Sequence, residues 1–315
     1  MYKEKVISVV VPAYNEETQI TKVINTIPSF IDYIVVIDDC SQDNTLEIIK
    51  EISKANEKVI VIHHETNQGV GGAIASGYKW SRDNNIDAAV VMAGDGQMDP
   101  KDLPLLLDPV VSGEVHYSKA NRLIYQDAYS NIPKIRFFGN AILSLLTKIA
   151  SGYWHISDSQ TGYTVICKEA LQCIDWDKTY KRYGQPNDLL VRLNVHNFIV
   201  QDVPLKPVYN VGERSKLKVR KVIWTLSFLL IKMFFWRLKE KYIIRDFHPL
   251  VLFYAYGFIF MFLGLCFLIR LLIIFFSTHT IPEITLVLTL FCFGSGMQSI
   301  FFAMFFDQDN NKHLK

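Results

Sequence analysis

The sequence predicts an α/β domain with a mostly parallel sheet over residues 1–212, followed by a membrane anchor of two helices. Short runs rich in Val and Ile alternate with helical patterns in the first part of the chain, which is typical of a parallel sheet covered by helices. Two later stretches, Pro249–Ser277 and Ile281–Phe306, are each hydrophobic over more than the ~20 residues that cross a bilayer. The change from a water-soluble to an apolar composition indicates that one substrate lies in the membrane.

Four strands, each followed by a helix, can be assigned in order. The predicted strands are Val6–Val11, Tyr33–Ile37, Val59–Ile62 and Ala88–Met92, and the predicted helices are Glu16–Ile27, Asn44–Lys54, Gly72–Trp80 and Asp102–Val111. Polar segments follow the strands at Pro12–Glu17, Asp38–Asp43, Asn67–Gly72 and Gly94–Asp99. Ligands of such sheets bind outside the carboxyl ends of the strands, so we expect the chemistry at these segments.

Basic residues gather in residues 213–248, directly before the first hydrophobic stretch. They are Arg214, Lys216, Lys218, Arg220, Lys221, Lys232, Arg237, Lys239 and Lys241. A polybasic segment in this place suits helices that lie in the interface against anionic headgroups, and a solvated helix face is the alternative.

Two further apolar segments have two interpretations each. Val222–Trp236 is apolar but contains Lys232, which favours a helix in the membrane interface over a third span. Phe137–Ala150 is apolar over much of its circumference and is either a core helix or one that dips into the membrane.

The distribution of charge predicts the orientation. The connection Ser277–Ile281 carries no Lys or Arg, whereas the α/β domain and the tail, residues 307–315, both do. The positive-inside rule therefore places the α/β domain and the C-terminus in the cytoplasm of an integral membrane protein, which we expect in a bacterial inner or plasma membrane.

The net charge and the glycines limit the kinds of partner that the sequence predicts. A formal net charge of +2 argues against a nucleic-acid partner. The two hydrophobic stretches, residues 249–306, contain glycines that permit close helix contacts and hence a homo-oligomer such as a tetramer: Gly257, Gly264, Gly294 and Gly296.

The acidic strand ends point to a metal-bridged nucleotide. Gly69–Gly72 lacks the spacing of a P-loop or a dinucleotide fingerprint. A carboxylate-lined site that holds a nucleoside diphosphate needs a divalent cation, and Mg²⁺ and Mn²⁺ accept one or two carboxylates together with phosphate oxygens. Asp95 stands where such an ion would be held, with Gln97 and Asp99 close by. A lone acidic turn is usually only a loop, but here three strand ends are acidic.

These same segments carry a resemblance to a known family. VPAYNEE at Val11–Glu17, DDCSQDNT at Asp38–Thr45 and GDGQMDP at Gly94–Pro100 resemble family 2 glycosyltransferases with the GT-A fold. The likeness continues through SDSQTGY at Ser157–Tyr163 and GERSKL at Gly212–Leu217. It is strongest to polyprenyl-phosphate sugar synthases such as dolichol-phosphate mannose synthase and the GtrB-like glucosyltransferases.

The resemblance implies a role for each matching residue. Pro12, Tyr14 and Glu16 would line the nucleotide pocket, and Asp39 would bind the base. Asp95 and Gln97 would hold Mg²⁺ or Mn²⁺ on the donor diphosphate, which makes Asp95 catalytic together with Asp158 and Arg122. Arg214, Ser215 and Lys216 would meet the acceptor phosphate, and Arg136, which stands before the apolar segment Phe137–Ala150, is a further cation that we expect there from its position. The reaction would be inverting transfer of a sugar from a UDP- or GDP-sugar to a polyprenyl phosphate, undecaprenyl or dolichyl.

Cations rather than a base suit a phosphate acceptor. A phosphate monoester is already largely anionic at pH 7, because its second pKa is about 6, so no proton must leave as the bond forms. Lys and Arg can neutralise and position it. We therefore favour a positioning or metal-supporting role for Asp158, and a general base role if the acceptor is a hydroxyl.

One departure from the family pattern concerns the metal motif, and two alternatives to the favoured reaction stay open. The first aspartate of the metal motif is Ala93 here, so water, Gln97 or Asp158 would have to replace it. The alternatives are a transferase acting on a glycolipid or polysaccharide hydroxyl, and a degenerate membrane adaptor without catalysis. The QxxRW pattern of processive synthases is absent from the sequence, which goes against the first.

Overall fold

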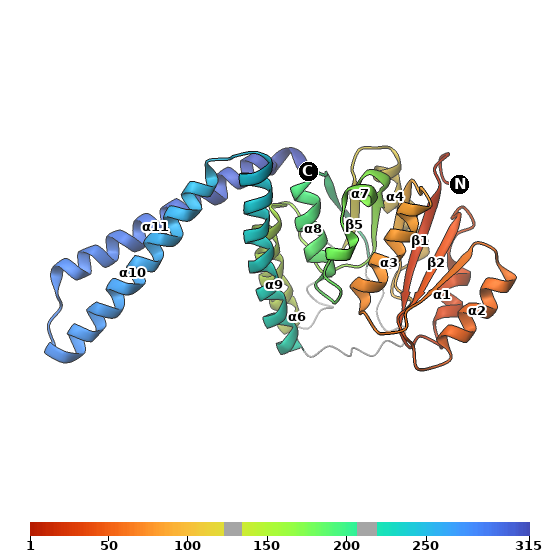
Figure 1. The fold of residues 1–315 in the computed structure, drawn as a ribbon, viewed down its shortest axis with the longest axis horizontal. Coiled ribbons are helices and arrows are strands. Elements are labelled where there is room, and N and C mark those ends of the chain that lie inside the picture. The colour runs from red at the N-terminus through yellow and green to blue at the C-terminus, as the bar shows by residue number, and fades with distance from the viewer. Residues whose placement is uncertain (123–133, 207–218) are drawn as a thin grey trace. The chain divides into compact units, whose positions relative to one another are not determined.

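A computed structural model of the chain describes residues 1–122, 134–206 and 219–315. The chain divides into two compact units, Met1–Phe234 with Leu314–Lys315, and Phe235–His313 (Figure 1). The first unit contains the predicted α/β domain with its mostly parallel sheet, and the second contains the two predicted hydrophobic helices.

The first unit is built on one sheet, which has seven strands in the described part of the chain. The strands are β1 (Ile7–Ala13), β2 (Tyr33–Asp38), β3 (Val59–His63), β4 (Ala88–Val91), β5 (Tyr117–Asn121), β6 (Thr164–Cys167) and β7 (Val200–Pro204). Their order is β3-β2-β1-β4-β6-β5-β7. All neighbouring pairs are parallel except those of β6, which runs antiparallel to β4 and β5.

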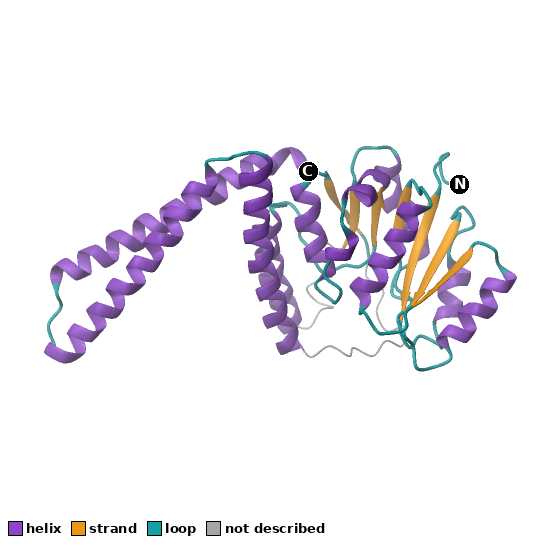
Figure 2. Ribbon diagram, in the orientation of Figure 1, coloured by secondary structure: helices purple, strands orange, loops and turns teal. Residues whose placement is uncertain are grey.

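Helices flank this sheet (Figure 2). They are α1 (Ile20–Thr26), α2 (Thr45–Ala55), α3 (Val70–Asp83), α4 (Leu103–Val111), α6 (Lys134–Ser151), α7 (Lys168–Cys173) and α8 (Gln185–Val195), with short 3-10 turns at Pro100–Asp102 and Trp176–Lys178. A further helix, α9 (Val219–Lys239), begins in the first unit and ends in the second. Every residue of β1 is buried, because helices cover both faces of the central strands. A Cβ on Gly77 would lie 2.3 Å from Cγ1 of Val10, so a glycine is needed where α3 packs on β1.

The largest local difference from the sequence-based assignment is at the first helix. The predicted helix Glu16–Ile27 begins only at Ile20. The backbone N–H of Glu16 instead donates to Oγ1 of Thr45, 2.9 Å away in the loop after β2. The segment after β1 is therefore a loop tied to its neighbour, which leaves it at the edge of the sheet where a ligand can reach it.

Two helices of the second unit are long and apolar enough to cross a membrane, among the residues that the structure describes. They are α10 (Leu250–Thr278) and α11 (Glu283–Asn311), and a π-helical turn at Glu240–Arg245 precedes them. Helix α9 is not among these candidates, which goes against the third span considered at Val222–Trp236. Helix α11 continues beyond Phe306, so the beginning of the predicted tail is helical.

Glycines bring α10 and α11 into close contact. A Cβ on Gly257 would lie 3.1 Å from the carbonyl oxygen of Gly296, and a Cβ on Gly264 would meet the ring of Phe293 at 3.2 Å. Three of the four glycines expected to permit an oligomer are thus used within the chain. The fourth, Gly294, has open space around it among the described residues.

A buried polar cluster, which we call the clasp, joins the end of α9 and the π-helical turn to the end of α11. It consists of Arg237, Lys241, Tyr242, Asp307 and Asn311. The guanidinium of Arg237 donates to both carboxylate oxygens of Asp307, at 2.8 and 2.9 Å, and both side chains are fully buried. This pairing explains why α11 runs past the predicted end of the span.

Candidate active site

The first two motifs meet at the carboxyl ends of β1 and β2. The backbone N–H of Gln42 donates to Oδ1 of Asn15 at 2.8 Å, in addition to the bond between Glu16 and Thr45. Pro12 is buried in β1, whereas Tyr14 is exposed and Glu16 half-buried in the loop that follows. Tyr14 and Glu16, which are predicted to line a nucleotide pocket together with Pro12, are therefore accessible at this edge.

Asp39 is a buried and rigidly held carboxylate just after β2. Its Oδ1 accepts the backbone N–H of Gln68 at 2.8 Å and its Oδ2 that of Gly69 at 2.7 Å. Nδ1 of His64 lies 2.8 Å from Oδ1. These bonds attach the loop after β3 to the loop after β2, because the two strands are parallel neighbours. Asp39 thus joins the second and third polar segments into one surface.

The predicted metal loop follows β4 and lies against β1. The backbone N–H of Gly94 donates to the carbonyl oxygen of Pro12 at 3.3 Å. Within the loop, Oδ1 of Asp95 accepts the backbone N–H of Gln97 at 3.1 Å. Oδ1 of Asp99 caps the turn Pro100–Asp102. The carboxylates of Asp95 and Asp99 are thus held in a short turn at the same edge of the sheet.

The donor set of this loop fits a divalent ion only together with a substrate. No three His, Cys, Asp or Glu side chains of the described residues are grouped as a metal site. Mg²⁺ keeps several waters and binds through one or two carboxylates plus substrate phosphates. Asp95 meets that requirement, while the methyl group of Ala93 adds no ligand.

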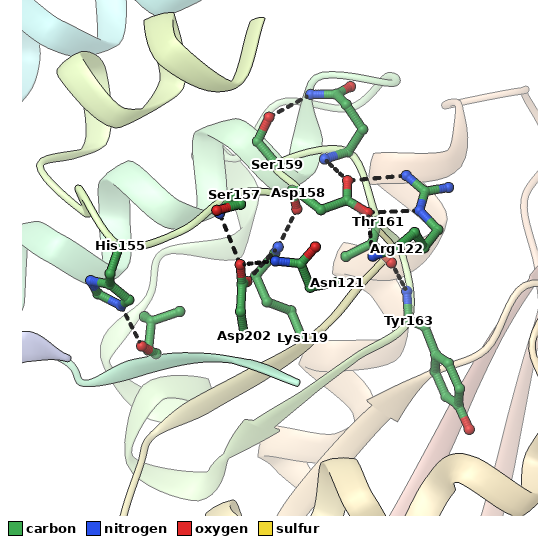
Figure 3. Close-up of polar contacts among 12 residues, drawn as sticks. Lys119, Asn121, Arg122, His155, Ser157, Asp158, Ser159, Thr161, Tyr163 and Asp202 are labelled. Carbon is green, nitrogen blue, oxygen red and sulfur yellow. Dashed lines mark hydrogen bonds and ion pairs between the residues drawn. The ribbon is translucent and has the colours of Figure 1, made fainter. Parts of the chain in front are cut away.

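Asp158 and Arg122 form a bidentate ion pair (Figure 3). Nε of Arg122 donates to Oδ2 of Asp158 at 2.7 Å and Nη2 to Oδ1 at 3.1 Å. The backbone N–H groups of Arg122 and Gln160 donate to the same carboxylate at 3.1 and 3.2 Å. The Asp158 side chain is 3% exposed and that of Arg122 32% exposed.

These contacts keep the Asp158 carboxylate ionised. Burial alone raises its pKa, but the charge and hydrogen bonds of Arg122, together with the charge of Lys119, outweigh burial, so the pKa lies below its ordinary value. A carboxylate with a lowered pKa is a weak base at neutral pH. The geometry therefore supports a positioning role for Asp158 rather than proton abstraction.

The loop that carries Asp158 also contacts the metal loop. The hydroxyl of Tyr163 donates to the backbone carbonyl oxygen of Asp99 at 3.0 Å. A Cβ on Gly162 would lie 3.5 Å from Cε of Met98. Four of the five motifs found in the sequence thus lie along one edge of the sheet, joined by hydrogen bonds.

The residues predicted to meet the acceptor are placed only in part. Arg136 lies in α6, but its side chain is outside the described residues. Arg214, Ser215 and Lys216 also fall outside them. Their predicted role as acceptor-phosphate ligands stays a prediction.

Sequence reasoning missed three buried polar residues below Asp158: Lys119, Asn121 and Asp202. Nζ of Lys119 donates to the carbonyl oxygen of Asp158 and to Oδ1 of Asp202, the latter at 3.0 Å. Lys119 and Asn121 stand two residues apart on β5, which ends directly before Arg122. Residues two apart on a strand point to the same side, so this spacing was the signal in the sequence that Lys119 and Asn121 share one face.

Helix α6 has the reverse of the usual amphipathic pattern. Ser144 and Thr147 are buried, whereas Ile142, Leu145 and Leu146 are exposed. A helix that faced water would show the opposite arrangement. The exposed face favours contact with an apolar phase, which was one of the two interpretations of Phe137–Ala150.

Helix α9 is apolar on opposite faces. Leu226, Leu229, Leu230 and Met233 are buried, and a Cβ on Gly184 would lie 2.5 Å from Cδ2 of Leu229. The other face exposes Trp224, at 74%, with Phe228 and Ile231. Exposed large apolar side chains in a row mark an interaction surface for a membrane or another protein.

Comparison with known proteins assigns the chain to a family. The family model for glycosyl transferase family 2 matches residues 8–175. A UDP-N-acetylglucosamine–dolichyl-phosphate N-acetylglucosaminyltransferase of Methanococcus voltae is 33% identical over 219 residues, which are 65% of this chain and 87% of that protein. An undecaprenyl-phosphate mannosyltransferase of Micrococcus luteus is 26% identical over 211 residues, which are 66% of this chain and 86% of that protein.

Solved structures show the same architecture. Glucosyl-3-phosphoglycerate synthase of Mycobacterium tuberculosis, crystallised with Mn²⁺, UDP and glucosyl-3-phosphoglycerate, aligns with a TM-score of 0.53 and 21% identity over 74% of this chain and 80% of that chain. At this identity the likeness concerns the fold alone, which is GT-A, as the sequence motifs predict. The match to the family model covers more than half of the chain and includes the four motifs at the edge of the sheet, so this protein belongs to glycosyl transferase family 2.

Proposed function

We propose that this glycosyltransferase moves one sugar from a nucleotide sugar to the phosphate of a membrane polyprenol, with inversion at the anomeric carbon. The bond between the anomeric carbon and the nucleoside diphosphate breaks, and a phosphate oxygen of the acceptor forms the new bond to that carbon. The observation that carries this proposal is the ion-paired Asp158, because an acceptor that brings its own negative charge needs no base.

The donor would bind at the edge formed by the first three motifs. Asp39 would bind the base, and the backbone N–H groups of Gln68 and Gly69 hold its carboxylate in one position before a nucleotide arrives. Tyr14 and Glu16 are accessible beside it and would line the nucleotide pocket with Pro12. The relative from Methanococcus voltae is named for a UDP-N-acetylglucosamine donor, which makes that sugar nucleotide the first one to test.

Asp95 and Gln97 would hold Mg²⁺ or Mn²⁺ against the donor diphosphate. Such an ion stabilises negative charge on a leaving diphosphate. With Ala93 in place of a second carboxylate, Asp95 is the anionic ligand of the loop, and phosphate oxygens and water would complete the coordination.

Arg122 would supply positive charge where the acceptor phosphate meets the donor. Asp158 fixes its guanidinium by two hydrogen bonds, and about a third of the Arg122 side chain remains accessible to solvent. Guanidinium groups bind phosphates strongly, because their N–H groups match the phosphate oxygens. Arg136, Arg214, Ser215 and Lys216 are proposed as further acceptor ligands on chemical grounds.

The acceptor would reach the site from the membrane. We propose that α10 and α11 span a cytoplasmic membrane, with the GT-A domain and the C-terminus on the cytoplasmic side. The exposed apolar faces of α6 and α9 would lie in the interface, next to the polyprenyl chain. Undecaprenyl and dolichyl phosphates are both candidates, since relatives are named for each.

The test is a transfer assay on the whole chain in nanodiscs. UDP-N-acetylglucosamine, UDP-glucose, UDP-galactose, GDP-mannose and UDP-glucuronate would each be offered with Mg²⁺ or Mn²⁺ and either polyprenyl phosphate. A polyprenol of the same length without phosphate serves as the matched acceptor control. Lipid-linked monosaccharide formed from the phosphate alone supports the proposal. Transfer to the free hydroxyl, or nucleotide binding without any transfer, refutes it.

A further inference from the structure

A buried ion pair lies below the Asp158–Arg122 pair. Lys119 on β5 and Asp202 on β7 are register partners in the parallel sheet. Nζ of Lys119 lies 3.0 Å from Oδ1 of Asp202, and the side chains are 1% and 8% exposed. Figure 3 shows this pair beneath the loop that carries Asp158.

The pair holds that loop at two consecutive residues. Oδ2 of Asp202 accepts the backbone N–H of Ser157 at 2.8 Å, and Nζ of Lys119 donates to the backbone carbonyl oxygen of Asp158. Nδ2 of Asn121 donates to the same Oδ2 at 2.5 Å and fixes the carboxylate from the strand side. The backbone on either side of the Asp158 Cα is thereby fixed, and this sets where its carboxylate can point.

The four side chains form a row of alternating charge. Asp202 is paired with Lys119, and Asp158, whose carbonyl oxygen binds Lys119, is paired through its carboxylate with Arg122. A buried ion pair is a poor source of stability, because removing both charges from water offsets most of their attraction. The packing of apolar side chains would stabilise the sheet here at least as well, so the charges call for another explanation.

We propose that Lys119 and Asp202 are positioning residues, which hold the Asp158 carboxylate where it orients Arg122 toward the acceptor phosphate. This inference rests on the proposed role of Arg122 in the transfer reaction. The pair belongs to the part of the site around Asp158 and Arg122 and not to the motifs proposed to bind the nucleotide. The hydrogen bonds of Lys119 and Asp202 link them to each other and to residues 121, 157 and 158. Their loss should therefore lower kcat and leave nucleotide binding unchanged.

Four variants test the proposal. Lys119→Met and Asp202→Asn each remove one charge at nearly constant volume, and the double variant Lys119→Met/Asp202→Asn removes both. Arg192→Met is the matched control, because it breaks another largely buried ion pair, with Asp188 at 2.8 Å, inside α8 of the same unit. The chain would be kept whole and in nanodiscs for all measurements.

The expected kinetic result separates positioning from folding. Each single variant should lower kcat by ~10–100-fold, the usual effect of displacing a reacting group by about 1 Å. The affinity for UDP, measured by calorimetry with Mn²⁺, should match the wild type. In the double variant the melting temperature should recover, since no unpaired charge stays buried, while kcat stays low. The proposal is overturned if kcat recovers together with the melting temperature in the double variant, or if Arg192→Met lowers kcat as much as the single variants do.

Hydrogen–deuterium exchange gives a readout that needs no turnover. The backbone N–H groups of Arg122 and Gln160 both donate to the Asp158 carboxylate, so their protection reports its position. Lys119→Met should speed exchange of these two amides, and Arg192→Met should not. Unchanged protection in Lys119→Met overturns the inference. If the wild type transfers no sugar, the proposed function fails, and exchange still shows whether the pair positions Asp158.

Discussion

Breaking the Asp158–Arg122 pair from its two sides should have unequal effects on stability. In Arg122→Met, the Asp158 carboxylate stays 3% exposed and loses both side-chain hydrogen bonds. In Asp158→Asn, the Arg122 guanidinium loses its partner but is already 32% exposed and can bind water. The two variants therefore remove the same interaction and leave behind differently solvated groups.

The structure sets the rough sizes of these effects. Removing one partner of a buried ion pair costs about 3–5 kcal/mol when the other stays buried and unpaired. For Arg122→Met we expect the lower end, ~3 kcal/mol, because the N–H groups of Arg122 and Gln160 still donate to Asp158. For Asp158→Asn we expect ~1–2 kcal/mol, since a partly exposed charge pair contributes less.

The assay is urea unfolding of the detergent-solubilised protein at several pH values. Because the pKa of Asp158 is lowered in the folded state, the pair stabilises the fold fully above the unfolded pKa of 3.8. Its contribution is lost only as pH falls through the folded value, so the effect of Asp158→Asn should be constant from pH 5 to pH 8. A greater loss of stability in Asp158→Asn than in Arg122→Met, or an effect of Asp158→Asn that titrates within that range, would contradict this assignment of burial and charge to the pair.

Three further predictions concern the metal loop, the clasp and α6. Asp95→Asn should abolish Mn²⁺-dependent UDP binding in calorimetry, and Ala93→Asp should tighten that binding by restoring a second carboxylate. An affinity for UDP that is the same in both variants as in the wild type would exclude this loop as the metal site. The pKa of Lys241 in the clasp is lowered to about 7, first by burial and then by the charge of Arg237. In the unfolded chain Lys241 keeps its proton up to about its ordinary pKa of 10.5, so the free energy of unfolding should rise between about pH 7 and pH 9, by at most ~1.4 kcal/mol per pH unit. Lys241→Met should remove this pH dependence in thermal unfolding. Ile142→Glu with Leu145→Glu should raise KM for undecaprenyl phosphate, but not for a short-chain analogue or for the donor; an equal rise for both acceptors would speak against α6 as a lipid contact.

The sequence predicted the part of the fold that local patterns encode. The runs of Val and Ile in β1, β2 and β4 are almost entirely buried on both faces, and β3 at the edge of the sheet is mostly half-buried, so their composition identifies them as strands of a parallel sheet. The polar residues at their ends then gave the location of the site. These signals are local, and the structure confirms the elements within a few residues.

Elements that depend on distant partners could not be predicted. β5 was not assigned from the sequence, because its Lys119 and Asn121 are polar and their burial depends on Asp202 in β7. Asp307 and Asn311 suggested that α11 had ended, whereas the clasp buries them inside the helix. In each case a polar residue is buried because its partner comes from another part of the chain.

The same distinction holds for the site. The polar segments after the strands included Asp39, which directly follows β2, and Asp95, which lies a short turn beyond the end of β4. The roles of Arg122 and Asp158 came only from the resemblance, and no spacing in the sequence predicts that these two side chains form a pair. The pair exists because the antiparallel strand β6 places the loop before it next to the end of β5.

The most direct test of the account is the identity of both products of one turnover. The chain in nanodiscs would be given undecaprenyl phosphate and the active nucleotide sugar, and lipid and nucleotide products would be read by mass. Transfer of the sugar to the lipid phosphate gives a lipid carrying one sugar on a single phosphate and releases the nucleoside diphosphate in equal amount. A lipid carrying a sugar diphosphate with release of the nucleoside monophosphate would contradict it, as would a sugar attached to a hydroxyl.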